Sequence, residues 1–405
     1  MKPRVLFVAE TVTLAHAVRP IVLGRMLRMD LYDVILAADD RYDELFTQLP
    51  EHREGLYTIG SDQFIKALAA GKPLYDDATL MRYVKDDLAL IERVKPDLII
   101  GDFRLSLSVS ARLCNLPYVA ISNLYWSPYA QQRYPVPDLP LTRLVGIAAA
   151  QMVFSLVRPM AFALHCGPLN RVRKRFGLPS LGRDLRRVYT DADLTLYADV
   201  PGYVRTVSLP SNHRPIGPLL WSPGTALPRW WDDVKIGVPL IYVTLGSSGA
   251  ADKLVEVLKG VVGLGALAMV ATAGRVSIPT ELKKRGVYVA DFLPGADAVK
   301  RADLVICNGG SPATQQALAA GKPVLGLPSN LDQYLNAASL ARAGVGKWLR
   351  SDRLRANDLA SVVSSMLGDA VLHRRAREAQ AHLAAYSAAM LFPPIVDEML
   401  SSHPS

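Results

Sequence analysis

The chain has 405 residues, of which 50% are hydrophobic and 20% charged, and its formal net charge is +9. This length exceeds what one hydrophobic core ordinarily supports, so two domains are expected, and the composition excludes a disordered chain. The three cysteines, Cys114, Cys166 and Cys307, lie far apart. Their number and spacing exclude a disulfide framework and a cysteine metal site and favour a reduced, cytoplasmic setting.

The N-terminal half alternates short apolar runs with helical patterns, which predicts βαβ units around a parallel sheet. The runs are continuous and apolar, as in strands covered on both faces by helices, and lie at residues 5–9, 34–38, 98–101 and 118–121. After the first run we expect a loop through Ala15 and a helix that starts near Pro20, because proline suits the first turn of a helix.

An apolar tract at residues 145–164 is interrupted by Gln151 and by Arg158 and Pro159. A membrane-spanning helix needs about 20 residues without such breaks, so the tract is interpreted as a core or interfacial helix. A basic cluster follows at Arg171, Arg173, Lys174, Arg175, Arg183, Arg186 and Arg187. It is interpreted as a solvated helix face, with attraction to anionic lipid or an acidic acceptor as the alternative. Nucleic acid is not an expected partner, because no aromatic residues are interleaved with these charges.

Several other polar or aromatic groups remain open to a structural explanation. Tyr125 and Trp126 follow a predicted strand at the edge where ligands bind, so they either line an acceptor pocket or pack in the core. The Asp191 and Asp193 pair has a metal–diphosphate spacing but precedes a strand-like run, and no metal site is expected. Asp86 and Asp87 are interpreted as solvated charges, as are the aspartate pairs at 39–40 and 76–77.

A stretch rich in proline and glycine separates two halves of the chain. It places a linker at 221–238, between a first domain at 1–220 and a second at 239–385, and a C-terminal helix at 386–405 is expected to pack back on the first domain. Beyond the linker the strand pattern restarts, at 240–245, 267–272, 287–290, 304–307 and 324–327, with a helix at 253–262. The predicted fold class is α/β, with two facing Rossmann-like, doubly wound domains and a cleft between them.

Two loops at predicted strand ends carry groups suited to a diphosphate. After Cys307 a Gly309–Gly310 turn leads to Ser311, a favoured N-cap, and Pro312, a favoured first helical residue. The unpaired N–H groups of such a helix start form an anion site, although a tight connection alone has the same pattern. The loop at 244–249 carries Ser247 and Ser248, which either hold a second edge of the diphosphate or belong to a flexible loop.

The segment at 303–338 resembles the donor-binding signature of family 1 glycosyltransferases of the GT-B fold, and the resemblance extends more weakly over most of the chain. It implies a diphosphate turn at Asn308–Gly310, with Ser311 and Thr314 beside it. The resemblance also implies that Gln316 contacts the ribose and that Asp332 and Gln333 contact the sugar. Phe292 would stack on the base. Asn308 replaces the usual histidine and Gln316 the usual glutamate, which keeps the geometry but weakens the charge.

The same resemblance implies a catalytic pair in the first domain. The family carries a histidine after the first strand, matched by His16, and an aspartate in the context reproduced at 99–103, matched by Asp102. Asp102 closes a predicted parallel strand and should emerge at the same sheet edge as His16. An aspartate that accepts from one ring nitrogen orients the histidine and leaves the other nitrogen as a general base.

The implied activity is an inverting, metal-independent transfer of a sugar from a UDP- or dTDP-linked donor, a co-substrate rather than a cofactor. The acceptor is expected to be a hydroxyl of a hydrophobic small molecule or a lipid-like one. The weakened charges at Asn308 and Gln316 leave a non-catalytic nucleotide-binding or activator protein as one alternative, and a nucleotide-sugar epimerase of the same fold is another. The basic and apolar residues at 145–187 allow peripheral contact with the inner face of the membrane.

Overall fold

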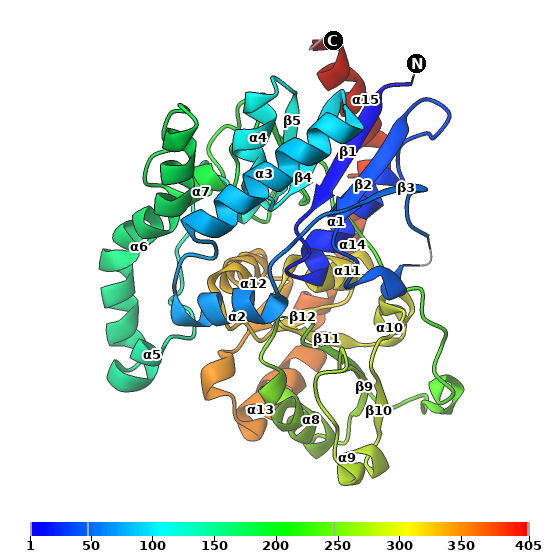
Figure 1. The fold of residues 1–405 in the computed structure, drawn as a ribbon. Helices are drawn as coiled ribbons and strands as arrows, with labels where there is room; N and C mark the ends of the chain where they lie inside the picture. Colours follow the sequence, from blue (N-terminus) through cyan, green and yellow to red (C-terminus); the bar gives the residue numbers. More distant parts are fainter. Residues whose placement is uncertain (1, 47, 247, 403–405) are drawn as a thin grey trace. The chain divides into compact units, whose positions relative to one another are not determined.

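The computed structural model describes residues 2–46, 48–246 and 248–402, which form two compact units, each built on one parallel sheet (Figure 1). The first unit comprises Met1–Gln132, Leu141–Leu219 and Tyr386–Ser405. The second comprises Arg133–Pro140 and Leu220–Ala385. Neither unit is therefore one continuous stretch of chain.

The first unit has a sheet in the order β3-β2-β1-β4-β5-β6-β7. Its strands are β1 (Arg4–Ala9), β2 (Asp33–Ala38), β3 (His52–Gly55), β4 (Leu98–Asp102), β5 (Tyr118–Ser122), β6 (Leu194–Tyr197) and β7 (His213–Pro215). Every neighbouring pair in this sheet is parallel. The strand order reverses direction between β1 and β4, and this is the switch point at which ligands of open α/β sheets bind.

Helices cover both faces of this sheet because alternate residues of β1 point to opposite sides. Leu6 and Val8 pack in one cluster with Leu90 of α3 (Asp77–Val94) and Leu107 of α4 (Leu107–Leu113). Phe7, on the other face, lies 6.2 Å between ring centroids from Phe392 of α15 (Ala388–Ser402). The remaining helices of the unit are α1 (Leu14–Gly24), α2 (Ser61–Ala70), α5 (Pro140–Val145), α6 (Ile147–Arg175) and α7 (Leu185–Val188).

The start of α1 differs from the sequence prediction. The helix begins at Leu14, with Thr13 as its N-cap, and Pro20 lies inside it. The missing N–H of Pro20 would have bonded to the carbonyl of His16, so the helix loses that hydrogen bond but continues. The helix is buried on all sides from Ala17 to Gly24, and this burial offsets the loss.

The second unit has a sheet in the order β10-β9-β8-β11-β12-β13. Its strands are β8 (Leu240–Thr244), β9 (Leu267–Ala271), β10 (Val287–Ala290), β11 (Leu304–Cys307), β12 (Val324–Gly326) and β13 (Gly346–Trp348). Its helices are α8 (Leu254–Gly263), α9 (Thr280–Lys284), α10 (Gly295–Arg301), α11 (Ser311–Ala319), α12 (Leu331–Ala343), α13 (Ala356–Leu367) and α14 (Ala370–Ala384). The core of this unit joins Ile241 and Val243 to Val257 of α8 and Leu359 of α13. The switch point lies between β8 and β11.

The segment Arg133–Pro140 is held in the second unit by one partly buried carboxyl group. Asp138 accepts hydrogen bonds from the Tyr334 hydroxyl at 2.6 Å and from Arg350 Nη2 at 2.9 Å. Its backbone N–H donates to the carbonyl of Ser329 at 3.0 Å. Burial raises the pKa of the Asp138 carboxyl despite these partners. The segment therefore lies beside the start of α12, which carries Asp332 and Gln333.

The helix α15 belongs to the first unit although it ends the described chain. Phe392 is fully buried, and Arg214 donates to Glu398 at 2.6 Å. The Tyr32 hydroxyl hydrogen-bonds to Asp397. Burial raises the pKa of Tyr32 to about 12, and the Asp397 contact acts in the same direction.

Candidate active site

His16 and Asp102 lie side by side at the switch point of the first sheet. Asp102 is the last residue of β4 and pairs in register with Ala9 at the end of β1, and His16 stands in the first turn of α1. The distance from His16 Nδ1 to Asp102 Oδ1 is 2.8 Å. The Asp102 side chain is fully buried, whereas the His16 ring is partly exposed. A neutral ring that donates from Nδ1 carries its lone pair on Nε2, as a general base must.

Arg19 shares the carboxylate of Asp102 and was not singled out from the sequence. Its Nε lies 2.6 Å from Asp102 Oδ2, and its Nη2 donates to Asp102 Oδ1 at 2.8 Å. Nη2 also lies 2.9 Å from His16 Nδ1. Both nitrogens are donors toward Asp102, so the carboxylate is the common acceptor. His16 and Arg19 are three residues apart and so lie on one side of a helix. This spacing was the sequence signal that could have placed Arg19 beside His16.

The polar network continues along the carboxyl edge of the sheet. Arg19 Nη1 donates to Asn123 Oδ1 at 2.8 Å, and Asn123 Nδ2 donates to Asp199 Oδ2 at 3.0 Å. Asn123 follows β5 and Asp199 follows β6. All three side chains are buried, so each supports the next and the position of Asp102 is fixed from two sides.

Phe103 forms a flat support for the His16 ring. The two ring centroids are 4.5 Å apart and the ring planes differ by 10°. Phe103 has φ 58°, a left-handed backbone conformation that a residue with a bulky side chain adopts only when its surroundings enforce it. The residue that follows it, Arg104, supplies that constraint.

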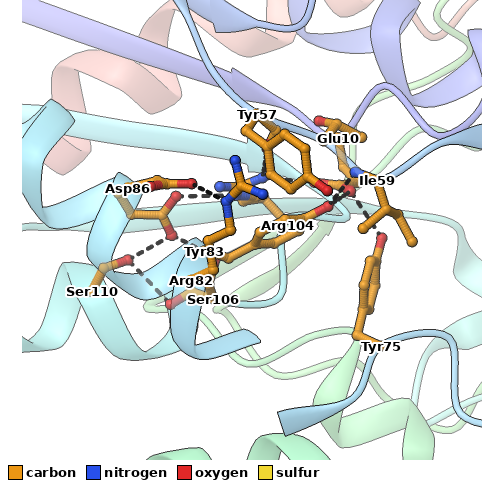
Figure 2. Close-up of polar contacts among 12 residues, drawn as sticks. Glu10, Tyr57, Ile59, Tyr75, Arg82, Tyr83, Asp86, Arg104, Ser106 and Ser110 are labelled. Atoms are coloured by element: carbon orange, nitrogen blue, oxygen red, sulfur yellow. Dashed lines mark hydrogen bonds and ion pairs between the residues drawn. The ribbon is translucent and has the colours of Figure 1, made fainter. Parts of the chain in front are cut away.

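Arg104, two residues after Asp102, is held in a buried cluster of charges (Figure 2). It donates to Glu10 at 3.1 Å, to Asp87 at 3.0 Å and to the carbonyl of Tyr57 at 2.8 Å. Burial raises the pKa of the carboxyls of both Glu10 and Asp87, and Arg104 opposes this shift. Asp87 is thus fully buried, and its interpretation as a solvated charge was wrong, because its partner lies 17 residues away in the sequence.

Aromatic rings continue from Phe103 toward α6. The centroid of Phe103 lies 5.1 Å from that of Tyr189, and Tyr189 lies 5.0 Å from Trp126. Trp126 lies 6.5 Å from Phe162 on α6. Trp126 and Tyr189 are partly exposed, whereas Tyr125 is 1% exposed and packs in the interior. Of the two aromatic residues proposed for an acceptor, Trp126 is therefore the more accessible.

In the second unit, the turn after β11 leads into the N-terminus of α11. The helix begins at Ser311 with Gly310 as its N-cap and Pro312 in its first turn, so the N-cap lies one residue before the predicted one. The Gly310 N–H donates to Asn308 Oδ1 at 2.9 Å, and Gly309 has φ 81°, which glycine tolerates. Gly310, as a glycine, has no side chain to cap this helix start. Its N–H groups point to the carboxyl edge of the sheet.

Buried groups behind the turn keep it in shape. Asn336 Nδ2 donates to the Gly309 carbonyl at 2.7 Å and to Thr314 Oγ1 at 2.8 Å. Thr314 itself donates to the Gly310 carbonyl at 3.1 Å. Both side chains are buried, so the sequence-predicted Thr314 lies behind the turn and supports it from inside.

The loop after β8 lies at the same edge, because Thr244 pairs in register with Cys307 of β11. Ser248 is contacted by Gln333, whose Nε2 lies 3.4 Å from its Oγ. Ser247 lies outside the described residues. Arg275, which the sequence reasoning did not single out, donates to the carbonyls of Gly246 at 3.1 Å and Gly249 at 2.9 Å. It places an exposed cation against the glycine loop.

The residues predicted to contact the sugar lie at the start of α12. Gln333 is buried, and its Oε1 accepts from the Ser329 backbone N–H at 3.0 Å. Asp332 is half-buried in the first turn of the helix. Gln333 therefore connects the loops that follow β8 and β12, and Asp332 is the more exposed of the pair.

Gln316 and Phe292 lie near one another around the start of α10. Gln316 Nε2 donates to the Trp221 carbonyl and to Ser222 Oγ, each at 2.9 Å. A Cβ atom on Gly295 would lie 2.4 Å from Gln316 Oε1, so this oxygen faces the segment just after the half-buried Phe292. The amide nitrogen of Gln316 is thus engaged in hydrogen bonds to other groups of the protein.

Among the residues that the structure describes, no group of three or more histidine, cysteine, aspartate or glutamate side chains is placed to hold a metal ion. The arrangement therefore consists of a histidine–aspartate pair with a shared arginine in the first unit and a set of loops and one helix start in the second.

The relatives found by sequence include three mycobacterial proteins. A "PGL/p-HBAD biosynthesis glycosyltransferase" of Mycobacterium tuberculosis is 47% identical over 378 residues, or 93% of this chain and 87% of the relative. A "PGL/p-HBAD biosynthesis rhamnosyltransferase" of Mycobacterium bovis is 48% identical over 90% of this chain and 80% of its own. An "inactive PGL/p-HBAD biosynthesis glycosyltransferase" of Mycobacterium bovis is 48% identical over 64% of this chain and 70% of its own.

The chain belongs to the family 1 glycosyltransferases of the GT-B fold. This glycosyltransferase also matches the model of the erythromycin biosynthesis protein CIII-like C-terminal domain over residues 256–399. It is an enzyme that uses a nucleotide-sugar as co-substrate.

Solved structures share the fold of this glycosyltransferase. The calicheamicin glycosyltransferase CalG4 aligns with a TM-score of 0.71 at 16% identity, covering 100% of both chains. The spinosyn rhamnosyltransferase SpnG, solved with thymidine diphosphate, aligns with a TM-score of 0.65 at 19% identity, covering 98% of this chain and 100% of its own. The predicted fold class, two Rossmann-like parallel-sheet domains, is confirmed.

Proposed function

We propose that this glycosyltransferase moves a sugar from a dTDP-linked donor to a hydroxyl of a lipid-like acceptor, with inversion and without a metal ion. The observation that carries the proposal is the placement of two different chemistries at the two sheet switch points. The first unit holds a base, His16 with Asp102, and the second holds an uncapped helix start after a glycine turn. Together they match the two needs of the reaction, proton removal and stabilisation of a leaving diphosphate.

The chemical step is a single displacement. His16 Nε2 accepts the proton of the acceptor hydroxyl while its oxygen forms a bond to the anomeric carbon. The bond from that carbon to the diphosphate oxygen breaks, and the electron pair leaves with the diphosphate. Attack from the face opposite the leaving group inverts the anomeric carbon. Asp102 stabilises the imidazolium that forms.

Negative charge that grows on the diphosphate is stabilised in the second unit. The first N–H groups of α11 carry the positive end of the helix dipole, and Asn308 adds an amide donor. Ser248 and the cation of Arg275 flank the glycine loop after β8. Fixed dipoles and one cation supply the charge stabilisation that a divalent ion provides in other enzymes, which supports a metal-independent reaction.

The state of Gln316 favours deoxyribose in the donor. A glutamate at this position would give ribose hydroxyls a charge-assisted acceptor, but Gln316 is neutral and its amide nitrogen already bonds to Trp221 and Ser222. A thymidine nucleotide lacks the 2′-hydroxyl and loses little at such a site. The thymidine diphosphate complex of the spinosyn rhamnosyltransferase and the name of the 48% identical rhamnosyltransferase support a dTDP-linked deoxysugar such as rhamnose.

The proposed base is tested by His16→Ala. We expect kcat to fall by roughly 10² to 10⁴, the usual contribution of general-base catalysis, while the Kd for dTDP stays within about twofold. The chain offers a matched control, because His52 Nδ1 also lies 2.8 Å from an aspartate, Asp33, but at the amino-terminal edge of the sheet. His52→Ala should leave kcat unchanged.

Product analysis separates the proposed transfer from its alternatives. Acceptor-dependent release of dTDP, with an inverted anomeric linkage by NMR, supports the proposal. A sugar nucleotide altered without acceptor would indicate an epimerase. Full activity in the His16→Ala variant would exclude His16 as the base.

A further inference from the structure

We propose that one exposed face of α6 rests on the surface of an anionic lipid bilayer and that a row of aromatic rings leads a lipid-like acceptor from it to His16. The inference rests on the proposed function, because it names where the acceptor comes from. It starts from a surface that the folding of the first unit leaves uncovered.

The exposed face is a stripe of large apolar side chains that we call the α6 stripe. It comprises Met152, Leu156, Met160 and Leu164, continued at the preceding helix by Leu144, and all five are exposed. Leu156 is 77% and Met160 64% exposed. Residues four apart lie on one side of a helix, so Met152 to Leu164 form a row about 18 Å long at 1.5 Å per residue. Scattered apolar residues are common on surfaces, but a continuous row indicates a binding surface.

The opposite face of α6 is anchored in the first unit. Phe154, Phe162 and Cys166 are buried, and α6 packs on α3 and α7. Figure 1 shows α6 along the outer side of this unit, with its length open to one side. By length and composition α6 and the stretch Ala370–Ser402 are apolar enough to cross a membrane. A helix fixed by one face and exposed on the other suits a position on the bilayer surface.

The basic residues around the stripe favour binding to an anionic lipid surface over a neutral one. No acidic residue lies between Asp138 and Asp184, whereas seven basic residues do, at Arg143, Arg158, Arg171, Arg173, Lys174, Arg175 and Arg183. Arg173 is buried against Asp191, and Arg171 is paired with Asp77, so these two belong to the fold. Arg143 is exposed beside Leu144, and Lys174 is exposed ten residues beyond Leu164 on α6. Basic groups beside an apolar row bind anionic lipid headgroups.

The other face of α6 connects to the proposed base. Rings pass from Phe162 to Trp126, from Trp126 to Tyr189 and from Tyr189 to Phe103, with centroids 5.0 to 6.5 Å apart. Phe103 then stacks on His16 at 4.5 Å. An apolar acceptor that leaves the bilayer beside α6 would keep contact with apolar rings until its hydroxyl meets His16.

A second copy of the chain is the competing occupant of the stripe. A twofold interface brings the same residues of both copies together, so two acid-free basic segments would face each other. Like charges oppose that contact, and the same charges attract anionic lipid.

The test measures binding to vesicles by co-flotation of the full chain. We expect binding to vesicles with 30% phosphatidylglycerol (about one lipid in three, a usual anionic fraction) and a fall of tenfold or more on neutral phosphatidylcholine or in high salt. Leu156→Glu with Met160→Glu should remove the binding. Ile236→Glu is the matched control, because Ile236 is 96% exposed and lies in the other unit. Equal binding by the stripe variant and wild type would overturn the inference, as would a stable dimer in light scattering that the stripe variant abolishes.

Activity on two forms of acceptor separates this inference from the proposed function. The stripe variant should keep kcat on a short, water-soluble phenolic or alcohol acceptor and lose at least tenfold in kcat/KM on an acceptor embedded in vesicles. An equal loss on both acceptors contradicts the membrane role. Absence of transfer by the wild type to either acceptor would count against the proposed function, while vesicle binding would still report on the stripe.

Discussion

At the scale of single residues, Asn308 has two separate roles in the proposed diphosphate turn. Its oxygen accepts from the Gly310 N–H and so belongs to the turn itself. Its nitrogen lies toward the glycine loop, since a Cβ on Gly246 would be 3.2 Å from it. The side chain thus shapes the backbone with one atom and offers a hydrogen-bond donor with the other.

Asn308→Asp should therefore weaken nucleotide binding while it preserves the turn. The new carboxylate still accepts from Gly310, but a negative oxygen replaces the amide donor that faces the diphosphate. We expect the Kd for dTDP to rise roughly 10- to 100-fold, about 1.4 to 2.8 kcal/mol, by calorimetry. Asn308→Ala should have a smaller effect. Asn357→Asp, at an exposed position of α13, serves as the control. Unchanged affinity in Asn308→Asp would remove this residue from the donor site.

Single residues at strand ends were the most predictable part of the candidate site. Asp102 ends one apolar strand and Asn308 follows another, and parallel strands end at one edge, so their placement follows from the sequence. Arg19 and Asp87 were not predictable in this way. Their partners lie far along the chain, and only folding shows that Arg19 shares Asp102 and that Asp87 pairs with Arg104.

At the scale of elements, the buried charge cluster joins β1, α3 and the turn after β4. Glu10 follows β1, Asp87 lies in α3, and Arg104 lies two residues after the end of β4. Tyr83 donates to Glu10 at 2.8 Å, and the guanidinium of Arg104 lies 3.5 Å from the centroid of the Tyr83 ring. One cation thus bridges two carboxyl groups and fixes the turn that carries Asp102 and Phe103.

Arg104→Met should destabilise the enzyme in a pH-dependent manner. It leaves two buried carboxylates without their cation, which costs about 3–5 kcal/mol of unfolding free energy near neutral pH. Burial already raises the pKa of Glu10 and Asp87, so the folded state binds protons more tightly than the unfolded chain. The variant should therefore be most stable in acid and should lose stability as pH rises through these raised pKa values.

Urea unfolding from pH 4 upward measures this dependence. Arg82→Met is the control, because Arg82 lies on α3 with Asp87 but its side chain is 55% exposed. It should change the unfolding free energy by less than about 0.5 kcal/mol. Adding Glu10→Gln and Asp87→Asn to Arg104→Met should restore much of the loss at pH 7. A loss of stability in Arg104→Met that is the same at every pH would contradict the assignment of two buried carboxylates.

Elements were predicted well where hydrophobic runs are continuous and less well at their ends. The central strands fell within one or two residues of their observed bounds, whereas the short strands β3, β7 and β13 carry few apolar residues and were missed. The start of α1 was placed six residues too late, because proline was taken as a start signal and packing overrode it. The tract in α6 is not a core helix, since only its inner face is buried.

At the scale of the whole molecule, the same strand order occurs twice. Each sheet runs 3-2-1-4-5-6 in its own numbering, with one further edge strand in the first. Each therefore has one switch point, and the proposed function assigns proton transfer to one and anion binding to the other. Amino-acid patterns revealed both sheets, but the side chains that differ between the two switch points determine which task each unit performs.

Hydrogen exchange with and without dTDP tests this division of tasks. The nucleotide should slow exchange of backbone amides in the second unit at the loop after β8, the turn before α11 and the start of α12. Amides around Glu10–His16 and Asn123 in the first unit should exchange as before. UDP should give weaker protection at equal concentration. Protection that is confined to the first unit would contradict the assignment of the donor site.

The discontinuous chain of each unit limits how such enzymes can be recombined. A hybrid joined only near Leu220 would take Arg350 and Tyr334 from one parent and Asp138 from the other, and would pair the Phe7 of one with the Phe392 of the other. A hybrid that exchanges the second unit between relatives should therefore take residues 133–140 together with residues 220–385 from one parent. The last helix, α15, should come from the parent that supplies the first unit. Such a hybrid has four junctions in its chain.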